Sequence, residues 1–234
     1  MRSVITFPQR PCACVIALLM IGCSIDGMTS EANDAIPVPT EGSSALGFRQ
    51  ELAQPWNQKP DPKLQPGVVR MTWTRDALIV EANLVDVEVM TKAARDNEMF
   101  WSLGDTFEIF LKLSAEPAIA ELHVAPNNKR LHLALPGPRG RRTPKSRPLP
   151  FEEMCVSPVG FTSAVTLTAN GWTVRAMIPS SVLGLAEFSR GQYLRVSFCR
   201  YDATSGQKPV LSTTASHPVI DFHRPEEWAL VVLE

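Results

Sequence analysis

Several kinds of sequence signal are missing from this chain, and each absence excludes a class of protein. The apolar run at residues 15–21 is far shorter than the roughly 20 residues that a membrane-spanning helix needs. The net charge of −1 provides no electrostatic field for capturing nucleic acid. No Gly-x-Ser-x-Gly, His-Glu-x-x-His or phosphate-cradling glycine loop is present, so no hydrolase or nucleotide motif supports an enzyme.

Cysteine is also scarce, with five residues in the chain. Cys12, Cys14 and Cys23 lie near the N-terminus, which leaves Cys155 and Cys199 for the folded part. No Cys-x-x-Cys spacing for a metal follows residue 23. In an oxidising compartment the two remaining cysteines can form a disulfide, and the sequence leaves this open beside the favoured alternative of two separate buried thiols.

The first residues have the three parts of a secretory signal: a basic region over residues 1–10, the apolar run at 15–21, and a small residue before a cysteine, Gly22-Cys23. The last part resembles a bacterial lipobox. The resemblance implies a signal peptide over residues 1–22, lipidation of Cys23, and an exported protein held at the cell envelope, at the outer membrane or cell surface. The alternative is an ordinary signal peptide that is cut slightly later.

Residues 23–44 are predicted to be a flexible tether, because residues 25–40 are small and polar and show no apolar period. Residues 45–234 then suit one large β domain, with 44% hydrophobic residues in the whole chain to supply a core. The basic run at residues 139–147 contains proline and glycine and indicates a solvated loop, with contact to an anionic polysaccharide or a membrane as the alternative.

Short runs of alternating apolar and polar residues, divided by polar turns, predict an all-β protein. Asn170-Gly171 is a hairpin signal, and residues 179–184 indicate a single helical turn. The predicted strands are residues 68–74, 77–86, 106–113, 119–124, 130–135, 161–168, 171–178, 193–201 and 228–233. We expect a jelly-roll-like sandwich of two antiparallel sheets, with about ten strands and a minor short helix.

The alternation also assigns faces to polar residues. In residues 106–113, Phe107, Ile109 and Leu111 face one way and Glu108 the other. In residues 119–124, Glu121 and His123 lie on the polar row. If these two strands share a sheet, the three polar side chains form a patch on its outer face.

The densest polar and aromatic stretch runs from Asp86 to Asn128. Asp86 ends a strand, the motif that begins at Trp101 continues through Asp105-Thr106-Phe107-Glu108-Ile109-Phe110, and a later strand ends near Pro126-Asn127. This arrangement resembles the family 9 carbohydrate-binding modules and their wider sugar-binding relatives. The segments 195–202, 211–214 and 221–230 agree in order, so the resemblance covers about residues 45–234. Three residues rather than two separate Trp101 from Asp105, which departs from the family's pattern.

The resemblance implies non-catalytic binding of a polysaccharide or oligosaccharide by a monomeric domain. Trp101 would stack on a sugar ring, and Glu108 and Asp86 would accept hydrogen bonds from its hydroxyls. The further candidates are Glu121, His123, Asn127 and Arg200 as secondary contacts, and Trp56 as a second aromatic. Family members also bind structural calcium, for which Asp86, Asp96 and Glu98 are the candidate ligands. An aromatic ring and charged acceptors suit a sugar, which has an apolar face and a rim of hydroxyls.

Other interpretations stand beside this one. Trp101 can be a core residue, Glu108 a solvated strand charge, Asp105 a turn cap and Arg200 an ion-pair partner of a sheet carboxylate. Related sandwiches of the DOMON type hold a b-type haem, which would here use Met99 with His123 or His217. A scaffold lipoprotein without a small ligand is a third class. Glu108 and Glu121 as a glycosidase pair have the least support, because nothing in the sequence marks either as buried or perturbed.

Overall fold

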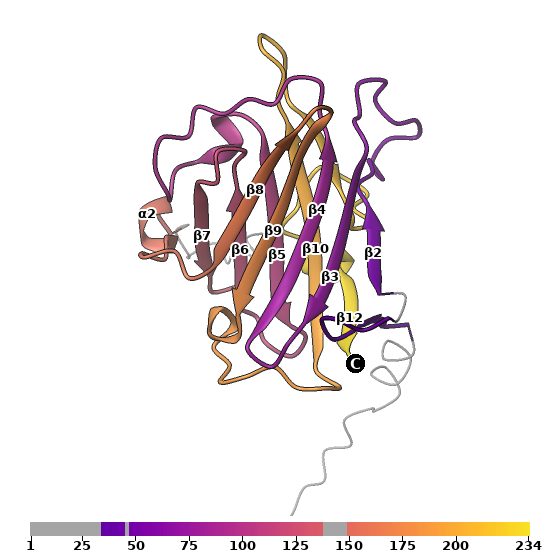
Figure 1. The fold of residues 1–234 in the computed structure, drawn as a ribbon, viewed down its shortest axis with the longest axis vertical. Coiled ribbons are helices and arrows are strands. Elements are labelled where there is room, and N and C mark those ends of the chain that lie inside the picture. The colour runs from indigo at the N-terminus through magenta and orange to yellow at the C-terminus, as the bar shows by residue number, and fades with distance from the viewer. Residues whose placement is uncertain (1–33, 45–46, 138–148) are drawn as a thin grey trace, which may run out of the picture. The chain divides into compact units, whose positions relative to one another are not determined.

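The computed structural model describes residues 34–44, 47–137 and 149–234 (Figure 1). The predicted signal peptide, Cys23, the first part of the predicted tether and the basic run at 139–147 lie outside these ranges, so they stay predictions. Within the described part of the chain, no helix combines the length and the apolar composition that crossing a membrane requires.

Two β-sheets form the domain, and Figure 1 shows the smaller one in front of the larger. The seven-stranded sheet has the order β1 (Ile36–Val38), β12 (Ala229–Leu233), β10 (Tyr193–Asp202), β5 (Thr106–Leu113), β6 (Ile119–Val124) and β7 (Arg130–Leu135), with β11 (Val210–Thr213) also paired to β10. The five-stranded sheet has the order β2 (Phe48–Glu51), β3 (Gly67–Trp73), β4 (Ala77–Val85), β9 (Gly171–Pro179) and β8 (Thr162–Thr168). The predicted sandwich is therefore confirmed.

The strands pair in an antiparallel manner with one exception, because β1 and β12 are parallel. Helical structure among the described residues is limited to short segments: η1 (Phe100–Ser102), α2 (Phe151–Met154), η2 (Ser180–Leu183) and η3 (Pro225–Glu227). The predicted helical turn at residues 179–184 corresponds to η2. The other three segments were not predicted, because a single turn is too short to show a helical period.

The core between the sheets follows the predicted alternation. Phe107, Ile109 and Leu111 of β5 are fully buried in it. They pack with the apolar rows of β4, β9 and β10, namely Leu78, Val80, Ala82, Leu84, Trp172, Val174, Ala176, Ile178, Leu194, Val196 and Phe198. Because period-2 alternation sends the odd and even rows to opposite faces, the polar row of β5 must lie on the outer side of its sheet.

The domain begins before the predicted boundary at residue 45. Ile36–Val38 form β1, which pairs with Val231–Leu233 of β12, and Val38 is fully buried. A second unpredicted strand, β2, follows and buries Phe48. Both strands are too short to show alternation, and β1 pairs with residues almost two hundred positions away in the sequence. A local pattern therefore cannot distinguish this segment from a tether.

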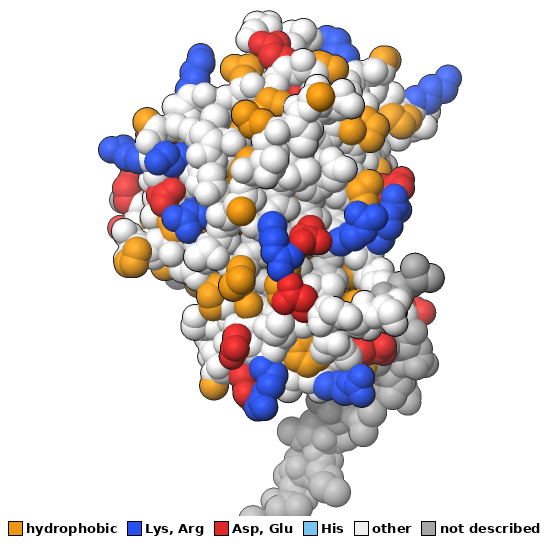
Figure 2. All heavy atoms as spheres, viewed as in Figure 1, with side chains coloured by type: hydrophobic (Ala, Val, Ile, Leu, Met, Phe, Trp, Pro, Cys, Tyr) orange, Lys and Arg blue, Asp and Glu red, His pale blue; other side chains and the backbone are white. Residues whose placement is uncertain are grey.

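The outer faces of the two sheets differ. Figure 2 shows acidic and basic side chains mixed over the face of the five-stranded sheet, which is the face towards the viewer in Figure 1. The outer face of the seven-stranded sheet instead carries a second buried cluster that includes Phe110, Phe222 and Trp228. The polar row of β5 and β6 is consequently covered rather than solvated.

Both cysteines of the domain are free thiols, which agrees with the alternative that the sequence favoured. Cys199 is fully buried on β10, whereas Cys155 is half-buried after α2.

Candidate functional site

The structure divides the predicted ligand residues between the two sides of the seven-stranded sheet. Glu108, Glu121 and His123 lie together on the outer side, because β5 pairs with β6 so that Glu108 is opposite His123. Asp86 continues the inward row of β4, and Arg200 continues the inward row of β10. Asp86 and Arg200 therefore belong to the end of the core and not to the patch that contains Glu108.

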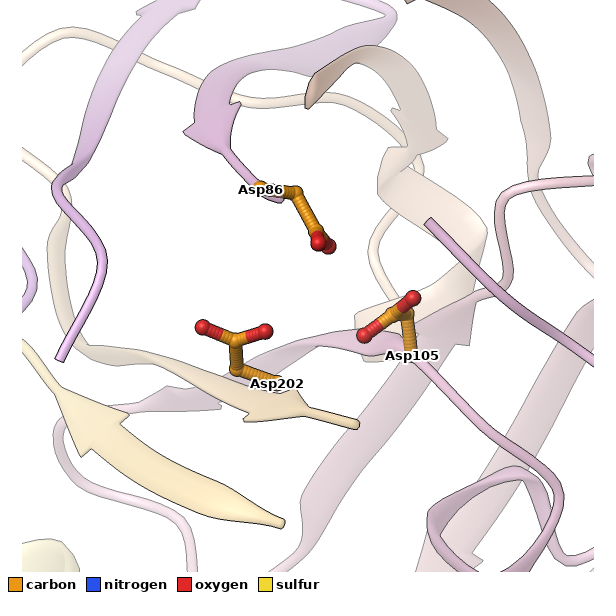
Figure 3. A group of neighbouring side chains, drawn as sticks. All are labelled: Asp86, Asp105 and Asp202. Atoms are coloured by element: carbon orange, nitrogen blue, oxygen red, sulfur yellow. The ribbon is translucent and has the colours of Figure 1, made fainter. Parts of the chain in front are cut away.

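At that end of the core, three aspartates converge on one another (Figure 3). Asp86, Asp105 and Asp202 each offer a carboxylate oxygen within 4.8 Å of the others, and all three are buried. Arg200, which is also buried, donates from Nη2 to Oδ2 of Asp86 at 2.9 Å and lies 3.3 Å from Oδ1 of Asp202. Its Nη1 donates to the carbonyl of Val85 at 2.6 Å. The predicted ion pair of Arg200 with a sheet carboxylate is confirmed.

Asp105 also holds two loops together. Its Oδ2 accepts the backbone N–H of Met90 at 2.6 Å, and its Oδ1 accepts that of Ala203 at 2.7 Å. Burial raises the pKa of Asp105 to about 7 and the pKa of Asp202 to about 6, and the nearby charge of Asp86 acts in the same direction. The role of Asp105 is thus wider than the turn cap that the sequence indicated.

This cluster does not fit calcium. A calcium ion needs six to eight oxygen ligands at about 2.3–2.6 Å, but the guanidinium of Arg200 already occupies the position between Asp86 and Asp202. Both oxygens of Asp105 point at backbone donors.

The other two residues of the predicted calcium set have separate partners. Asp96 accepts the backbone N–H of Arg130 and contacts its guanidinium at 3.3 Å. Glu98 accepts the backbone N–H groups of Ala94 and Arg95. The described residues do not bring Asp86, Asp96 and Glu98 together as one carboxylate group.

The polar patch on the outer side forms the base of a pocket of about 290 Å³, here called the outer pocket. Its polar lining includes Glu108 and Glu121 from the sheet, Tyr201 from β10, and Asp221 and His223 from the segment before η3. The apolar lining is Trp101, Ile220 and Phe222. Glu108 and Glu121 are each only 3% exposed, which excludes the alternative interpretation of Glu108 as a solvated strand charge.

A chain of carboxylates and imidazoles crosses the base of the outer pocket. His123 lies with Nδ1 3.4 Å from Oε1 of Glu108 and with Nε2 3.0 Å from Oε1 of Glu121. The second oxygen of Glu121, Oε2, lies 2.7 Å from Nε2 of His223. Burial acts to raise the pKa of Glu121, but the hydrogen bonds of His123 and His223 hold it well below its ordinary value. Glu121 is therefore an anion at neutral pH.

Aromatic rings surround this polar base. Trp101, on η1, is half-buried and packs edge-on against His123 at 5.5 Å and against Phe151 at 5.9 Å between ring centroids. Trp56 packs on Phe222 at 6.1 Å, behind the pocket wall. Trp101 is thus not a residue of the core between the sheets, and the structure brings it together with Glu108, Glu121 and His123.

The same indole lines a second hollow of about 440 Å³, here called the loop pocket. Its other walls come from Met90 and Lys92, from residues 102–104, and from the β10–β11 loop, including Ala203, Gln207 and Pro209. Lys92 is the charged residue among its lining residues. Trp101 therefore stands between two adjoining hollows of different chemistry.

Asn127 lies apart from both pockets. Its side-chain amide donates to the carbonyl of Ala93 at 2.7 Å, and its Oδ1 accepts the backbone N–H of Lys129 at 3.3 Å. These bonds join the β6–β7 turn to the loop before η1. Asn127 consequently helps to position the segment that carries Trp101.

The predicted haem ligands are engaged elsewhere. Both ring nitrogens of His123 face glutamates, and Nδ1 of His217 lies 2.7 Å from Oε2 of Glu227. Met99 is 42% exposed. No observation in the described part of the chain favours a haem site.

Sequence reasoning misses Tyr201 as a pocket residue and leaves the role of His223 undecided. The alternation of β10 contains a signal for Tyr201, because Phe198 faces the core and Tyr201 must then face outward. No local signal places His223, since it reaches Glu121 from 102 positions further along the chain.

Among the comparisons with known proteins, only the comparison with solved structures gives matches, and these support the fold. No protein-family model matches the sequence, and no curated protein matches it. A candidate carbohydrate-binding protein from Bacteroides uniformis superposes with a TM-score of 0.65 at 14% identity, over 86% of this chain and 97% of its own.

A family 9 carbohydrate-binding module from Caldicellulosiruptor kristjanssonii also matches. Its structure with cellotriose has a TM-score of 0.56 at 15% identity, over 86% of this chain and 93% of its own. Its structure with glucose gives the same TM-score at 16% identity, over 86% and 95%. At these identities the match establishes the fold, which is the fold that the sequence motifs indicated.

Proposed function

We propose that this protein, whose domain has the fold of the family 9 carbohydrate-binding modules, binds carbohydrate in the outer pocket without reacting with it. The observation that carries the proposal is the position of Trp101. Its half-buried indole lines a pocket whose base holds Glu108 and Glu121.

The chemistry of the pocket suits a sugar. A pyranose presents apolar C–H groups on one face and hydroxyl groups around its edge, so it needs both an aromatic surface and polar partners. Trp101 supplies the surface, and the carboxylates of Glu108 and Glu121 supply acceptors that form strong, charge-assisted hydrogen bonds. The similar module from Caldicellulosiruptor kristjanssonii was solved with cellotriose and with glucose, which supports the ligand class.

The protonation state of Glu121 favours binding over catalysis. A glycosidase of the usual type needs a carboxylic acid with a raised pKa as its proton donor, whereas the pKa of Glu121 is lowered by His123 and His223 against the effect of burial. Asp86 and Arg200, which the sequence suggested as ligand contacts, are committed to the inner cluster. In this proposal they stabilise the end of the domain and do not touch the sugar.

Replacing the indole tests the site. Trp101→Ala is expected to weaken binding of a glucan oligosaccharide by at least tenfold, about 1.4 kcal/mol, because the stacking surface is lost. Isothermal titration calorimetry with cellotetraose, following a glycan microarray to find the best backbone, measures this change.

Tyr193→Ala is the matched control. Tyr193 is an exposed aromatic residue at the other end of β10 from Tyr201, so its loss should leave affinity unchanged. Unaltered affinity in Trp101→Ala, or no binding of any glycan by the wild type, contradicts the proposal.

We also propose that the protein is exported and lipid-anchored through Cys23. The chain enters the domain at Ile36–Val38, beside the Tyr193 end of β10. The outer pocket includes Tyr201, eight positions along the same strand, which corresponds to roughly 26 Å. Figure 1 shows residues 34–44 at the lower end of the domain and the β10–β11 loop at the upper end. An anchor before residue 34 thus attaches to the end of the domain away from the pocket.

A further inference from the structure

The loop pocket adjoins the outer pocket at Trp101, and the sugar site proposed above does not include it. Its described lining comes from three segments: Met90 and Lys92, residues 101–104, and residues 203–207 with Pro209. Trp101 also lines the outer pocket. The two hollows therefore share one wall, and that wall is the indole.

Hydrogen bonds hold these three segments together. The carboxylate of Asp105 accepts the backbone N–H of Met90 at 2.6 Å and that of Ala203 at 2.7 Å, so it ties two walls of the loop pocket to the start of β5. The backbone N–H of Lys92 donates to the carbonyl of Leu103 at 2.7 Å. A pocket whose walls are fixed in this way is already formed before a ligand arrives, so binding does not have to order them.

The loop pocket also carries hydrogen-bond donors that the domain does not use. The ammonium group of Lys92 has three N–H donors, and it forms neither an ion pair nor a hydrogen bond within residues 34–44, 47–137 and 149–234. Oε1 of Gln207 accepts from Nζ of Lys63, and the amide N–H groups of Gln207 have no partner among the same residues. Unused donors beside an aromatic ring suit a ligand with many oxygen acceptors, such as a sugar unit.

The size of the loop pocket permits a ligand as well. Its volume of about 440 Å³ lies within the roughly 300–1,000 Å³ of small-molecule sites, whereas the outer pocket, at about 290 Å³, lies just below the lower limit. A ligand longer than one sugar unit would thus find more room beyond the indole than in the outer pocket itself.

We propose that the loop pocket is a second sugar subsite, so that the protein binds two adjacent units of a glycan chain, one in each hollow beside Trp101. This rests on the sugar-binding function proposed above and extends it, because that function needs only the outer pocket. In the loop pocket, Lys92 and Gln207 donate hydrogen bonds to the oxygens of the second unit. A unit that is covalently linked to one already bound meets the second subsite at a high effective concentration, so affinity rises steeply from one unit to two.

Saccharides of one to four units test the inference. They are taken from cellulose, xylan and mannan, and from the glycan that binds best on the microarray. Isothermal titration calorimetry with the purified protein measures the Kd for each length. In every series that binds, the Kd for the disaccharide is expected to be at least tenfold lower than that for the monosaccharide, with a smaller change from two units to four.

Variants assign the gain in affinity to the loop pocket. Lys92→Ala and Gln207→Ala should each reduce the gain from one unit to two at least threefold and leave the affinity for the monosaccharide unchanged. Both side chains are exposed, so both variants should fold. Lys208→Ala is the matched control and should keep the full gain, because Lys208 is an exposed lysine of the β10–β11 loop that does not line the loop pocket.

The outcomes separate the two proposals. Equal affinity for one unit and two in every series that binds, or a full gain in both loop-pocket variants, overturns the second subsite and leaves sugar binding in the outer pocket in place. Absence of binding to every series and to every glycan on the microarray overturns both.

Discussion

At the scale of single residues, the same side-chain types serve different purposes on the two sides of the seven-stranded sheet. Glu108 and Glu121 line a pocket and contact imidazoles. Asp86 and Asp202, in contrast, share the guanidinium of Arg200 inside the end of the core. A buried charge without a partner is strongly destabilising. We therefore expect that replacing Arg200 lowers the stability of the domain more than replacing a residue of the pocket.

Arg200→Met is expected to lower the free energy of unfolding by about 3 kcal/mol at pH 8, because it leaves buried carboxylates without their cation. The difference in the free energy of unfolding between wild type and variant should shrink as the pH falls from 8 to 5. The pKa values of Asp105 and Asp202 are already raised, so the folded state binds protons before the unfolded chain does and gains stability as pH falls. The charge of Arg200 lowers both pKa values, so without it they are raised further. The variant therefore gains more stability than the wild type as the pH falls. Urea unfolding at both pH values measures the change.

Arg175→Met is the matched control for that experiment. Arg175 contacts Glu41 and Glu81 on the exposed face of the five-stranded sheet, and exposed pairs contribute about 0–1 kcal/mol. A loss in Arg200→Met that is no larger than in Arg175→Met would show that the inner cluster is not held by its arginine. Wild-type stability should also be unchanged by EDTA, since the cluster does not fit calcium.

At the scale of elements, the segment that carries Trp101 is set by a close backbone approach. Gly104 has φ of +143°, and it forms a bridge with Thr91 just after η1. A Cβ atom there would lie 2.4 Å from the carbonyl oxygen of Met90, which no side-chain adjustment can relieve. Glycine is needed both for the backbone angle and for the space.

Gly104→Ala is therefore expected to destabilise the protein by about 3 kcal/mol and to weaken sugar binding through displacement of Trp101. Gly191→Ala provides the comparison, because Gly191 has φ of +81° and a Cβ atom added to it would meet nothing within 4 Å; its expected cost is about 1 kcal/mol. Thermal unfolding of both variants, with calorimetry of any that fold, measures these effects. Equal losses would refute the packing argument.

At the scale of the whole molecule, the first described strand, β1, and the pockets lie at opposite ends of the domain. β4 runs nine residues from the end near residue 40 to Asp86, roughly 30 Å. The proposed sugar site thus lies far from β1, which is the arrangement that the proposed N-terminal anchor would need for capture of a glycan outside a membrane.

Lipidation of Cys23 can be tested on the full chain in a Gram-negative host. Wild-type protein is expected in the membrane fraction with incorporated palmitate label, whereas Cys23→Ser should lose the label and leave that fraction. Cys14→Ser should behave as the wild type, because Cys14 lies before the predicted apolar run. Label retained in Cys23→Ser would contradict anchoring through this cysteine.

The alternating rows of β4, β5, β6 and β10 determine, from sequence alone, the sandwich and the side of the sheet on which each strand residue lies. This is a local property, since neighbouring side chains of a strand point to opposite faces. Glu108, Glu121 and His123 can therefore be grouped by sequence pattern, and the same rule sets Asp86 apart from them.

Only the tertiary structure decided which of those rows is covered. Phe222 and His223 line the pocket whose base holds Glu108 and Glu121, and Trp56, far away in the sequence, packs on Phe222. The parallel pairing of β1 with β12 is equally remote. Such contacts form when segments that are distant in the sequence pack on one face of a sheet. The local alternation of side chains carries no information about them. The pocket and the strand β1 could therefore not be deduced from local sequence pattern.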